Sequence, residues 1–116
     1  MRYLFLIYGN ETEGRQQSPA QREAQMQAYG AFTAEVQKAG VFRSGEELTE
    51  SGKATTVRTQ QGKLTTTDGP FAETKEQLGG FYELDCANLD EAIQWAAKIP
   101  HAKIGSIEIR PVVEFN

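Results

Sequence analysis

The chain has 116 residues and a mass of 12.9 kDa, which predicts a single domain over residues 1–116. Twelve Lys and Arg residues against sixteen Asp and Glu residues give a net charge of −4, which argues against a nucleic-acid-binding protein because such proteins carry a basic excess. The single cysteine excludes an intramolecular disulfide and a cysteine-based zinc site.

The apolar segment at the start of the chain is short. Residues 1–8 are largely apolar, but Gly9, Asn10 and Glu11 follow at once, so the segment is too short for a signal peptide or a membrane-spanning helix. We therefore expect a cytoplasmic protein that contacts neither nucleic acid nor a membrane.

The first half of the chain predicts a strand, a loop and a long helix. Residues 2–8 are aromatic and aliphatic and predict a central strand. Residues 11–17 are polar and predict a loop. Ser18 and Gln21 form a capping pattern, and the helical spacing of apolar residues predicts a helix over 19–38 that ends at Gly40. The strand is apolar on both faces, with Tyr3, Phe5 and Ile7 on one and Leu4, Leu6 and Tyr8 on the other.

A second strand and a hairpin follow. Residues 41–48 predict the strand. The threonine-rich segments 54–59 and 63–67 flank Gln60-Gln61-Gly62 and predict the hairpin, which the turn residues Asp68-Gly69-Pro70 end.

The remaining segments complete the plan. Residues 72–77 predict one or two helical turns, and residues 79–86 predict a strand whose two leading glycines allow a bulge or a close backbone approach. A helix capped by Asn88 is expected to end at Pro100, with Leu89, Ala92, Ile93, Ala96 and Ala97 on its apolar face. Residues 106–115 predict a final strand, in which Pro111 indicates an edge or a bend.

The predicted order is β-α-β-(hairpin)-β-α-β, the α+β plan of a ferredoxin-like sandwich with both helices on one face of an antiparallel sheet. Two helices cover only one face of such a sheet, yet the first strand is apolar on both. We expect a second copy to cover the open face, giving a homodimer with a cleft between the chains. The alternative is that the inserted hairpin folds over the open face.

The turn at Asp68-Gly69-Pro70 is the most distinctive feature of the sequence. In the conformational interpretation, Asp68 accepts hydrogen bonds from the amides that follow it and Phe71 anchors the turn in the core. In the functional interpretation, Asp68 is a catalytic carboxylate at a rigid turn beside a cleft, with Phe71 against the ligand. Glu73, Lys75 and Glu76 follow as a solvated turn or as further groups of the same pocket.

Other side chains are candidates for ligand binding. Tyr8 and Tyr29 have polar tips that suit either core packing or a ligand. Arg110 suits an anionic ligand or a carboxylate on a neighbouring strand. His101 is the single histidine, so it serves either to satisfy a helix end or as an acid or base, and a multi-histidine metal site is excluded. Cys86 is expected to be an inert thiol. We expect neither a metal nor a cofactor.

The run from Asp68 to Phe81, Asp-Gly-Pro-Phe-Ala-Glu-Thr-Lys-Glu-Gln-Leu-Gly-Gly-Phe, closely resembles the signature of the DGPF proteins, a branch of the YCII-related domain family. The opening segment 3–9, the residues Tyr29-Gly-Ala-Phe32 with Gly40, and the ending segment 105–111 are similar to the same family. The resemblance implies a ferredoxin-like fold that dimerises as an α/β barrel. It implies no defined reaction.

The resemblance also bears on the site and on partners. YCII-like relatives have a proposed histidine–aspartate pair whose histidine falls early in the first helix, but residues 22–26 contain none here, so that pair does not carry over. Asp68 matches the DGPF motif. Members are often encoded beside extracytoplasmic-function sigma factors. We therefore expect a small-molecule-binding homodimer that uses cofactor-free acid–base chemistry, or alternatively an interaction protein linked to a sigma factor without catalysis.

Overall fold

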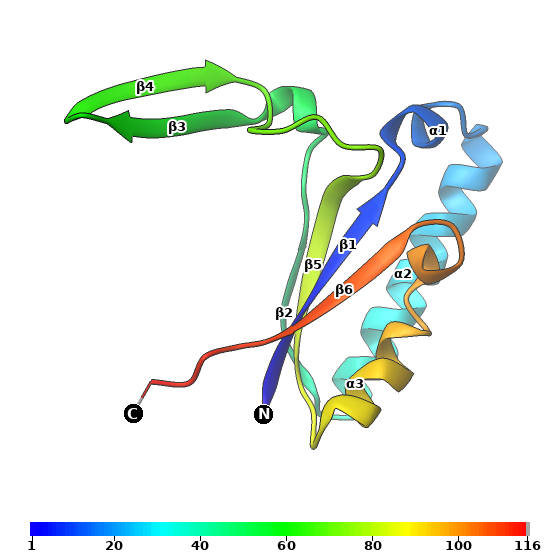
Figure 1. The fold of residues 1–116 in the computed structure, drawn as a ribbon. Coiled ribbons are helices and arrows are strands. Elements are labelled where there is room, and N and C mark those ends of the chain that lie inside the picture. The colour runs from blue at the N-terminus through cyan, green and yellow to red at the C-terminus, as the bar shows by residue number, and fades with distance from the viewer. Residues whose placement is uncertain (116) are drawn as a thin grey trace.

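The computed structural model describes residues 1–115 and has one main sheet of four strands in the order β2-β5-β1-β6. Each neighbouring pair is antiparallel, and helices α2 and α3 lie on the same side of the sheet (Figure 1). The chain is therefore an α+β protein whose arrangement is compatible with the predicted ferredoxin-like plan. The strands are β1 Arg2–Gly9, β2 Phe42–Glu47, β5 Gln77–Asp85 and β6 Ser106–Pro111; the helices are α2 Pro19–Lys38 and α3 Leu89–Ala96.

The core lies between the sheet and the two helices. Side chains alternate along β1, so that one set is buried against the helices and the other set is partly exposed, as the sequence predicted. Phe5 of β1 and Leu84 of β5 are fully buried. We call the other side of the sheet, which no helix covers, the open face; its apolar residues include Leu4, Leu6, Tyr8, Leu78 and Phe81.

Helix α2 forms where the sequence predicted it. The Ser18 Oγ accepts a hydrogen bond from the Gln21 amide at 3.1 Å, and the Gln21 side chain accepts one from the Ser18 amide at 2.9 Å. This reciprocal cap satisfies two amides that the first turn leaves without helical partners. After the helix, Gly40 has a φ of 76°, the left-handed conformation that glycine adopts easily.

Two short segments differ from the prediction. Residues Glu11–Arg15 form helix α1 instead of a loop, because the Asn10 side chain caps it by accepting from the Glu13 amide at 3.0 Å. The segment 72–77 is not helical: residues 72–76 are irregular and Gln77 begins β5. Thr74 Oγ1 donates to the Glu76 carbonyl, and the Gln77 side chain donates to the Thr74 carbonyl. Such local bonds compete with helix formation.

The last helix and the last strand of the chain are shorter than predicted. Helix α3 ends at Ala96, and Pro100 begins the 3₁₀ helix η2, Pro100–Lys103, instead of ending α3. Only Ala92 and Ala96 of the predicted apolar face are buried in α3, whereas Leu89 and Ile93 are half exposed. Strand β6 ends at Pro111 and forms an edge of the sheet, which confirms the interpretation of that proline.

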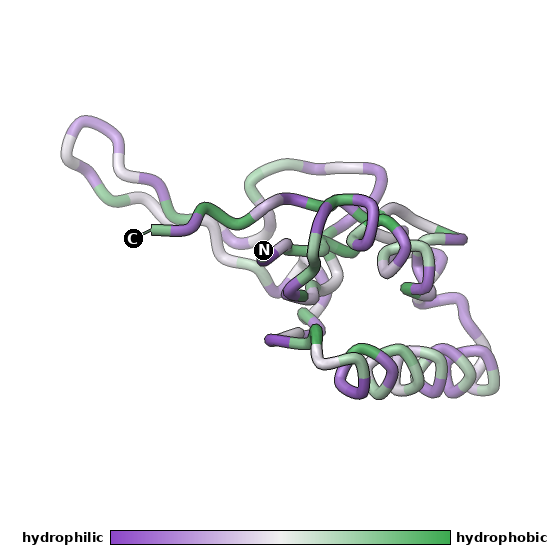
Figure 2. The backbone as a smooth tube through the Cα atoms, turned by 90° about the horizontal axis from the view of Figure 1, so that it is seen from below, coloured by the Kyte–Doolittle hydropathy of each residue, from purple (hydrophilic) through white to green (hydrophobic). Residues whose placement is uncertain are grey.

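The predicted hairpin forms but does not cover the sheet. Strands β3, Thr55–Gln60, and β4, Lys63–Asp68, pair only with each other through a two-residue turn. The hairpin, which we call the arm, follows the 3₁₀ helix η1, Ser51–Lys53, and projects away from the main sheet in Figures 1 and 2. The alternative in which it folds over the open face of its own chain is therefore wrong. Within residues 1–115, no helix combines the length and apolar character needed to cross a bilayer.

Candidate functional site

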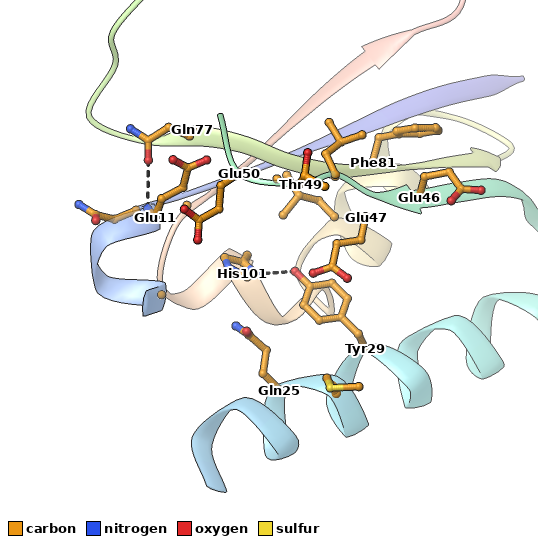
Figure 3. A pocket seen from close by; sticks show the side chains of 18 of the residues that line it. Glu11, Gln25, Tyr29, Glu46, Glu47, Thr49, Glu50, Gln77, Phe81 and His101 are labelled. Carbon is orange, nitrogen blue, oxygen red and sulfur yellow. Dashed lines mark hydrogen bonds between the residues drawn. The ribbon is translucent and has the colours of Figure 1, made fainter. Parts of the chain in front are cut away.

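A cavity of about 480 Å³ opens at one end of the main sheet, between the sheet, α1 and α2 (Figure 3). Its walls come from the ends of β1, β2 and β5, from the first turns of α2 and from η2. The volume falls within the range typical of small-molecule sites. These helices and strands therefore enclose a space, and the polar side chains that line it determine which ligands it suits.

Tyr29 and His101 meet inside this cavity. The Tyr29 hydroxyl and the His101 Nδ1 lie 2.5 Å apart, although the two residues are 72 positions apart in sequence (Figure 3). Tyr29 projects from the middle of α2. His101 belongs to η2, which is held in place by the fully buried Ile99 just before it. The helix and the 3₁₀ turn therefore bring a phenol and an imidazole into direct contact.

Both partners are uncharged at neutral pH. Burial raises the pKa of Tyr29 well above its ordinary value, although a hydrogen bond with the His101 backbone opposes this. Burial lowers the pKa of His101, although the negative charge of Glu76 opposes this. In the tautomer whose imidazole proton resides on Nε2, the Tyr29 hydroxyl donates to Nδ1, and in the other tautomer Nδ1–H donates to the Tyr29 oxygen. In the first tautomer the imidazole can accept one further proton that is relayed through the Tyr29 hydroxyl.

Gly9 makes room for the imidazole ring. A Cβ atom at this position would lie 2.9 Å from His101 Cδ2 and 3.1 Å from Nε2. The φ of Gly9 is not positive, so the close approach, and not backbone freedom, requires glycine here. The end of β1 therefore packs directly against the ring that Tyr29 contacts.

The cavity lining is acidic on balance. Four glutamates and two arginines line it, a net charge of −2. Two of these charges neutralise each other, because Arg15 and Glu50 form an ion pair of 2.6 Å at the rim. Glu47 points toward the Tyr29 ring in Figure 3. Such a surface attracts cationic and neutral polar molecules more than anions.

The two glycines of β5 shape the wall beside Glu47. The register of β1 against β5 shifts at Gly79, and a Cβ atom on Gly80 would lie 2.8 Å from the Glu46 carbonyl oxygen. This confirms both the bulge and the close backbone approach that the sequence predicted at these glycines. Glu47 pairs with Gly80 across the strands, so no side chain opposite it fills the cavity.

Glu11 ties the arm to the rim of the cavity. Its carboxylate accepts from the Ser51 amide at 2.6 Å and from the Ser51 hydroxyl at 2.8 Å, and its own amide donates to the Gln77 side chain at 3.0 Å. Ser51 precedes the arm and Gln77 follows the turn after it. Glu11 therefore connects the segment before the arm and the first residue of β5 to the start of α1.

The structure separates the residues that the sequence proposed as one site. Tyr29 lines the cavity. Tyr8 and Arg110 lie on the open face, where each contacts Glu108, at 3.5 Å and 3.3 Å respectively. Asp68 is exposed at the end of β4, at the base of the arm.

Phe71, just past the same turn, is 78% exposed, so the expectation that it anchors the turn in the core is wrong. The turn is held instead by backbone: the Gly69 amide donates to the Ala54 carbonyl at 2.6 Å, and Thr56 Oγ1 donates to the Gly69 carbonyl at 2.8 Å. Gly69 has a φ of 95°, which requires glycine. A single chain therefore places neither Asp68 nor Phe71 in the cavity.

The remaining candidates have structural surroundings. Cys86 is 1% exposed, and burial raises its pKa to about 11, as expected for an inert thiol. Glu76 accepts a hydrogen bond from the Ser106 hydroxyl at 2.7 Å, whereas Glu73 and Lys75 are exposed. Within residues 1–115, no three His, Cys, Asp or Glu side chains gather closely enough to hold a metal ion.

The sequence contained no signal for the pairing at the centre of the cavity. His101 was a candidate acid or base without a named partner, and Tyr29 was a candidate ligand contact. Their helix and 3₁₀ turn are joined through the packing of the whole domain, so no spacing along the chain encodes the contact. Gly9 was interpreted only as the end of a strand.

Comparison with known proteins gives two matches that span the chain. The model of the YCII-related domain matches residues 1–116. The chain is also 39% identical over 118 residues to an uncharacterized protein of Rhizobium meliloti (strain 1021), and the match covers 100% of this chain and 95% of that protein.

Proposed function

This chain belongs to the YCII-related domain family, and from this premise we propose that it is a homodimeric α/β-barrel protein that binds a small polar organic molecule in the cavity around Tyr29 and His101. The observation that carries the proposal is the contact of 2.5 Å between the two side chains inside a cavity of about 480 Å³. The finer assignment to the DGPF branch rests on the sequence motif from Asp68 to Phe81.

The cavity favours a ligand that is not an anion. Its net charge of −2 opposes a carboxylate or phosphate group, and Glu47 on the Tyr29 side suits an amine or a hydroxyl group. The neutral pair offers a hydrogen-bond acceptor at the Tyr29 oxygen. A small molecule with an amine or hydroxyl group beside Tyr29 satisfies both features.

The same pair suits acid–base chemistry without a cofactor. In the tautomer whose imidazole proton resides on Nε2, a proton leaves the bound molecule for the Tyr29 oxygen as the Tyr29 proton passes to His101 Nδ1, which leaves an imidazolium ion and a deprotonated ligand. Glu47 and Glu76 supply negative charge near this imidazolium. Return of the proton to another atom of the ligand completes an isomerisation and restores the neutral pair.

The composition of the open face supports the proposed homodimer. The centre of this face is apolar, with Leu6 opposite Phe81, and charged residues surround it, including Arg2 and Glu83, which pair at 2.9 Å. An apolar centre with a polar rim is the usual anatomy of a protein interface. In the proposed homodimer we expect the second copy to bring Asp68 to a cavity, and the substitution Asp68→Asn tests that role.

The proposal is tested by thermal-shift measurements with compounds sorted into amines, neutral polar molecules and carboxylates. We expect amines and neutral polar molecules to raise the melting temperature, because a ligand at 100 times its Kd adds about 2.7 kcal/mol of stability. Tyr29→Phe and His101→Asn should reduce these shifts, whereas Tyr3→Phe, on a tyrosine outside the cavity, should not. Shifts confined to carboxylates, or unchanged in Tyr29→Phe, would contradict the proposal.

A second experiment separates an enzyme from a binding protein. NMR detects whether a ligand that binds is converted into a new compound.

The alternative is the interaction protein linked to an extracytoplasmic-function sigma factor. A pull-down with a sigma factor encoded beside the gene separates the two proposals. A stable complex together with no ligand in any compound class would favour the interaction role.

A further inference from the structure

The single chain exposes more surface than a compact protein of its size. Its accessible surface is 8308 Å², whereas a compact monomer of 12.9 kDa exposes about 6300 Å². Its radius of gyration is 16.2 Å, against about 13 Å for a compact domain of 116 residues. The excess of about 2000 Å² is close to what each chain of an obligate homodimer buries.

The arm accounts for part of this excess and has two unlike faces. Partners across the hairpin share a face, so Val57 and Leu64 lie on one face together with Thr55, Thr59, Thr66 and Asp68. The opposite face has Arg58 and Lys63. Val57 is 58% exposed and Leu64 is 69% exposed, so this apolar face lacks cover within the chain.

A two-stranded hairpin of this kind is not stable by itself. Isolated hairpins are marginal in water and need a further strand, a helix or another chain against their apolar face. The main sheet does not provide it, because β3 and β4 pair only with each other. The stability of the arm therefore depends on a surface outside the chain.

The arm and the C-terminal segment extend toward the same side of the molecule. Both leave the main sheet on the side away from α2, at opposite ends of the open face (Figures 1 and 2). The C-terminal segment exposes Val113 by 68% and Phe115 by 92%. The apolar open face thus lies between two projecting segments that each carry exposed apolar side chains.

The root of the arm is fixed, so its direction is set by the fold. Glu11 holds the Ser51 leg through two hydrogen bonds and the Gln77 leg through one. Arg15 and Glu50 add an ion pair of 2.6 Å at the same place. These contacts hold the segment before the arm against the start of α1.

From these observations we propose that the arm is an exchange element: in the homodimer the Val57–Leu64 face of each arm packs on the second copy of the chain, which lies on the open face between the arm and the C-terminal segment. This inference rests on the proposed homodimer and adds the surface that holds it together. The occupant is a second copy because the excess surface of one chain matches one side of such a dimer.

The test uses two matched double variants of the arm in the full chain. Val57→Ser with Leu64→Ser removes the apolar face, and Arg58→Ser with Lys63→Ser changes the opposite face of the same strands as the control. Light scattering over a dilution series gives the dimer dissociation constant of each. We expect the apolar-face variant to raise this constant at least tenfold, and the control to change it less than threefold.

Three outcomes separate the claims. A wild-type dimer with equal constants for both variants would overturn the role of the arm while the homodimer stands. A wild-type monomer at micromolar concentration would overturn both the role of the arm and the homodimer. If that monomer forms a complex with a sigma factor, and the apolar-face variant does not, the arm binds that partner instead. Amide exchange in β3 and β4 gives an independent measure: the arm should exchange at least tenfold more slowly above the dimer dissociation constant than below it, and equal rates would contradict the proposal.

Discussion

The substitution Gly9→Ala tests the arrangement of the cavity directly. A Cβ atom on residue 9 would lie 2.9 Å from His101 Cδ2 and 3.1 Å from Nε2, closer than carbon and nitrogen atoms pack in proteins. The backbone accepts alanine here because the φ of Gly9 is not positive. The added methyl group therefore acts on the imidazole ring and not on the strand.

The size of the effect follows from the two ways in which the chain can respond. If the ring stays, the overpacked contact costs about 1–3 kcal/mol. If the ring rotates away, the hydrogen bond of 2.5 Å with Tyr29 is lost, at a cost of about 0.5–1.5 kcal/mol. We expect a loss of about 1–2 kcal/mol in the free energy of unfolding, and a fall in the melting temperature of roughly 4–8 °C.

Urea unfolding measures the stability, and NMR of the His101 ring reports its position. Gly14→Ala is the control, because a Cβ atom on Gly14 would meet nothing within 4 Å and because alanine favours the helix α1. We expect this control to gain up to about 1 kcal/mol. Gly9→Ala with wild-type stability and an unchanged His101 signal would refute the packing that we describe.

Three further predictions concern the same region. Tyr29→Phe should cost about 1 kcal/mol in urea unfolding because His101 Nδ1 loses its hydrogen-bond partner. Tyr3→Phe should cost less, since the Tyr3 hydroxyl only contacts the Met1 sulfur at 3.4 Å; equal costs would contradict the Tyr29–His101 bond. Burial lowers the pKa of His101, so the unfolded chain takes up its proton first. Stability is then full above the ordinary histidine pKa of 6.5 and falls as the pH drops below it. His101→Asn should flatten this dependence below pH 6.5, and a wild-type profile in His101→Asn would assign it to other groups. Glu11→Ala should speed amide exchange at Ser51 about tenfold or more, because two hydrogen bonds to a carboxylate are lost, and an unchanged rate would show that Glu11 does not hold the arm.

Local sequence patterns were sufficient to predict those features that depend on contacts between neighbouring residues. The cap of α2, the left-handed glycine after it and the hairpin turn at Gln61-Gly62 each depend on a few neighbouring residues, and all were predicted. The alternation along β1 likewise follows from the two-residue period of a strand. The error at α1 has the same origin: its five residues bury nothing, so no apolar period marked the helix.

The candidate site depended on contacts that sequence patterns do not contain. Of the five residues proposed as one site, only Tyr29 lines the cavity, while Tyr8 and Arg110 lie on the open face and Asp68 and Phe71 belong to the turn at the base of the arm. The Asp-Gly-Pro turn made Asp68 a candidate for the site. The same residues are favoured in turns that have no role in a site and serve only to reverse the chain.

Composition, periodicity and motifs were enough to predict the family, the α+β plan and the apolar residues on each side of β1. The contact of Tyr29 with His101 beside Gly9, and the position of the arm away from its own sheet, became visible only in the folded chain. The physical reason is the same in both cases: these contacts, or their absence, join segments far apart along the chain, and only the packing of the whole domain sets their distances.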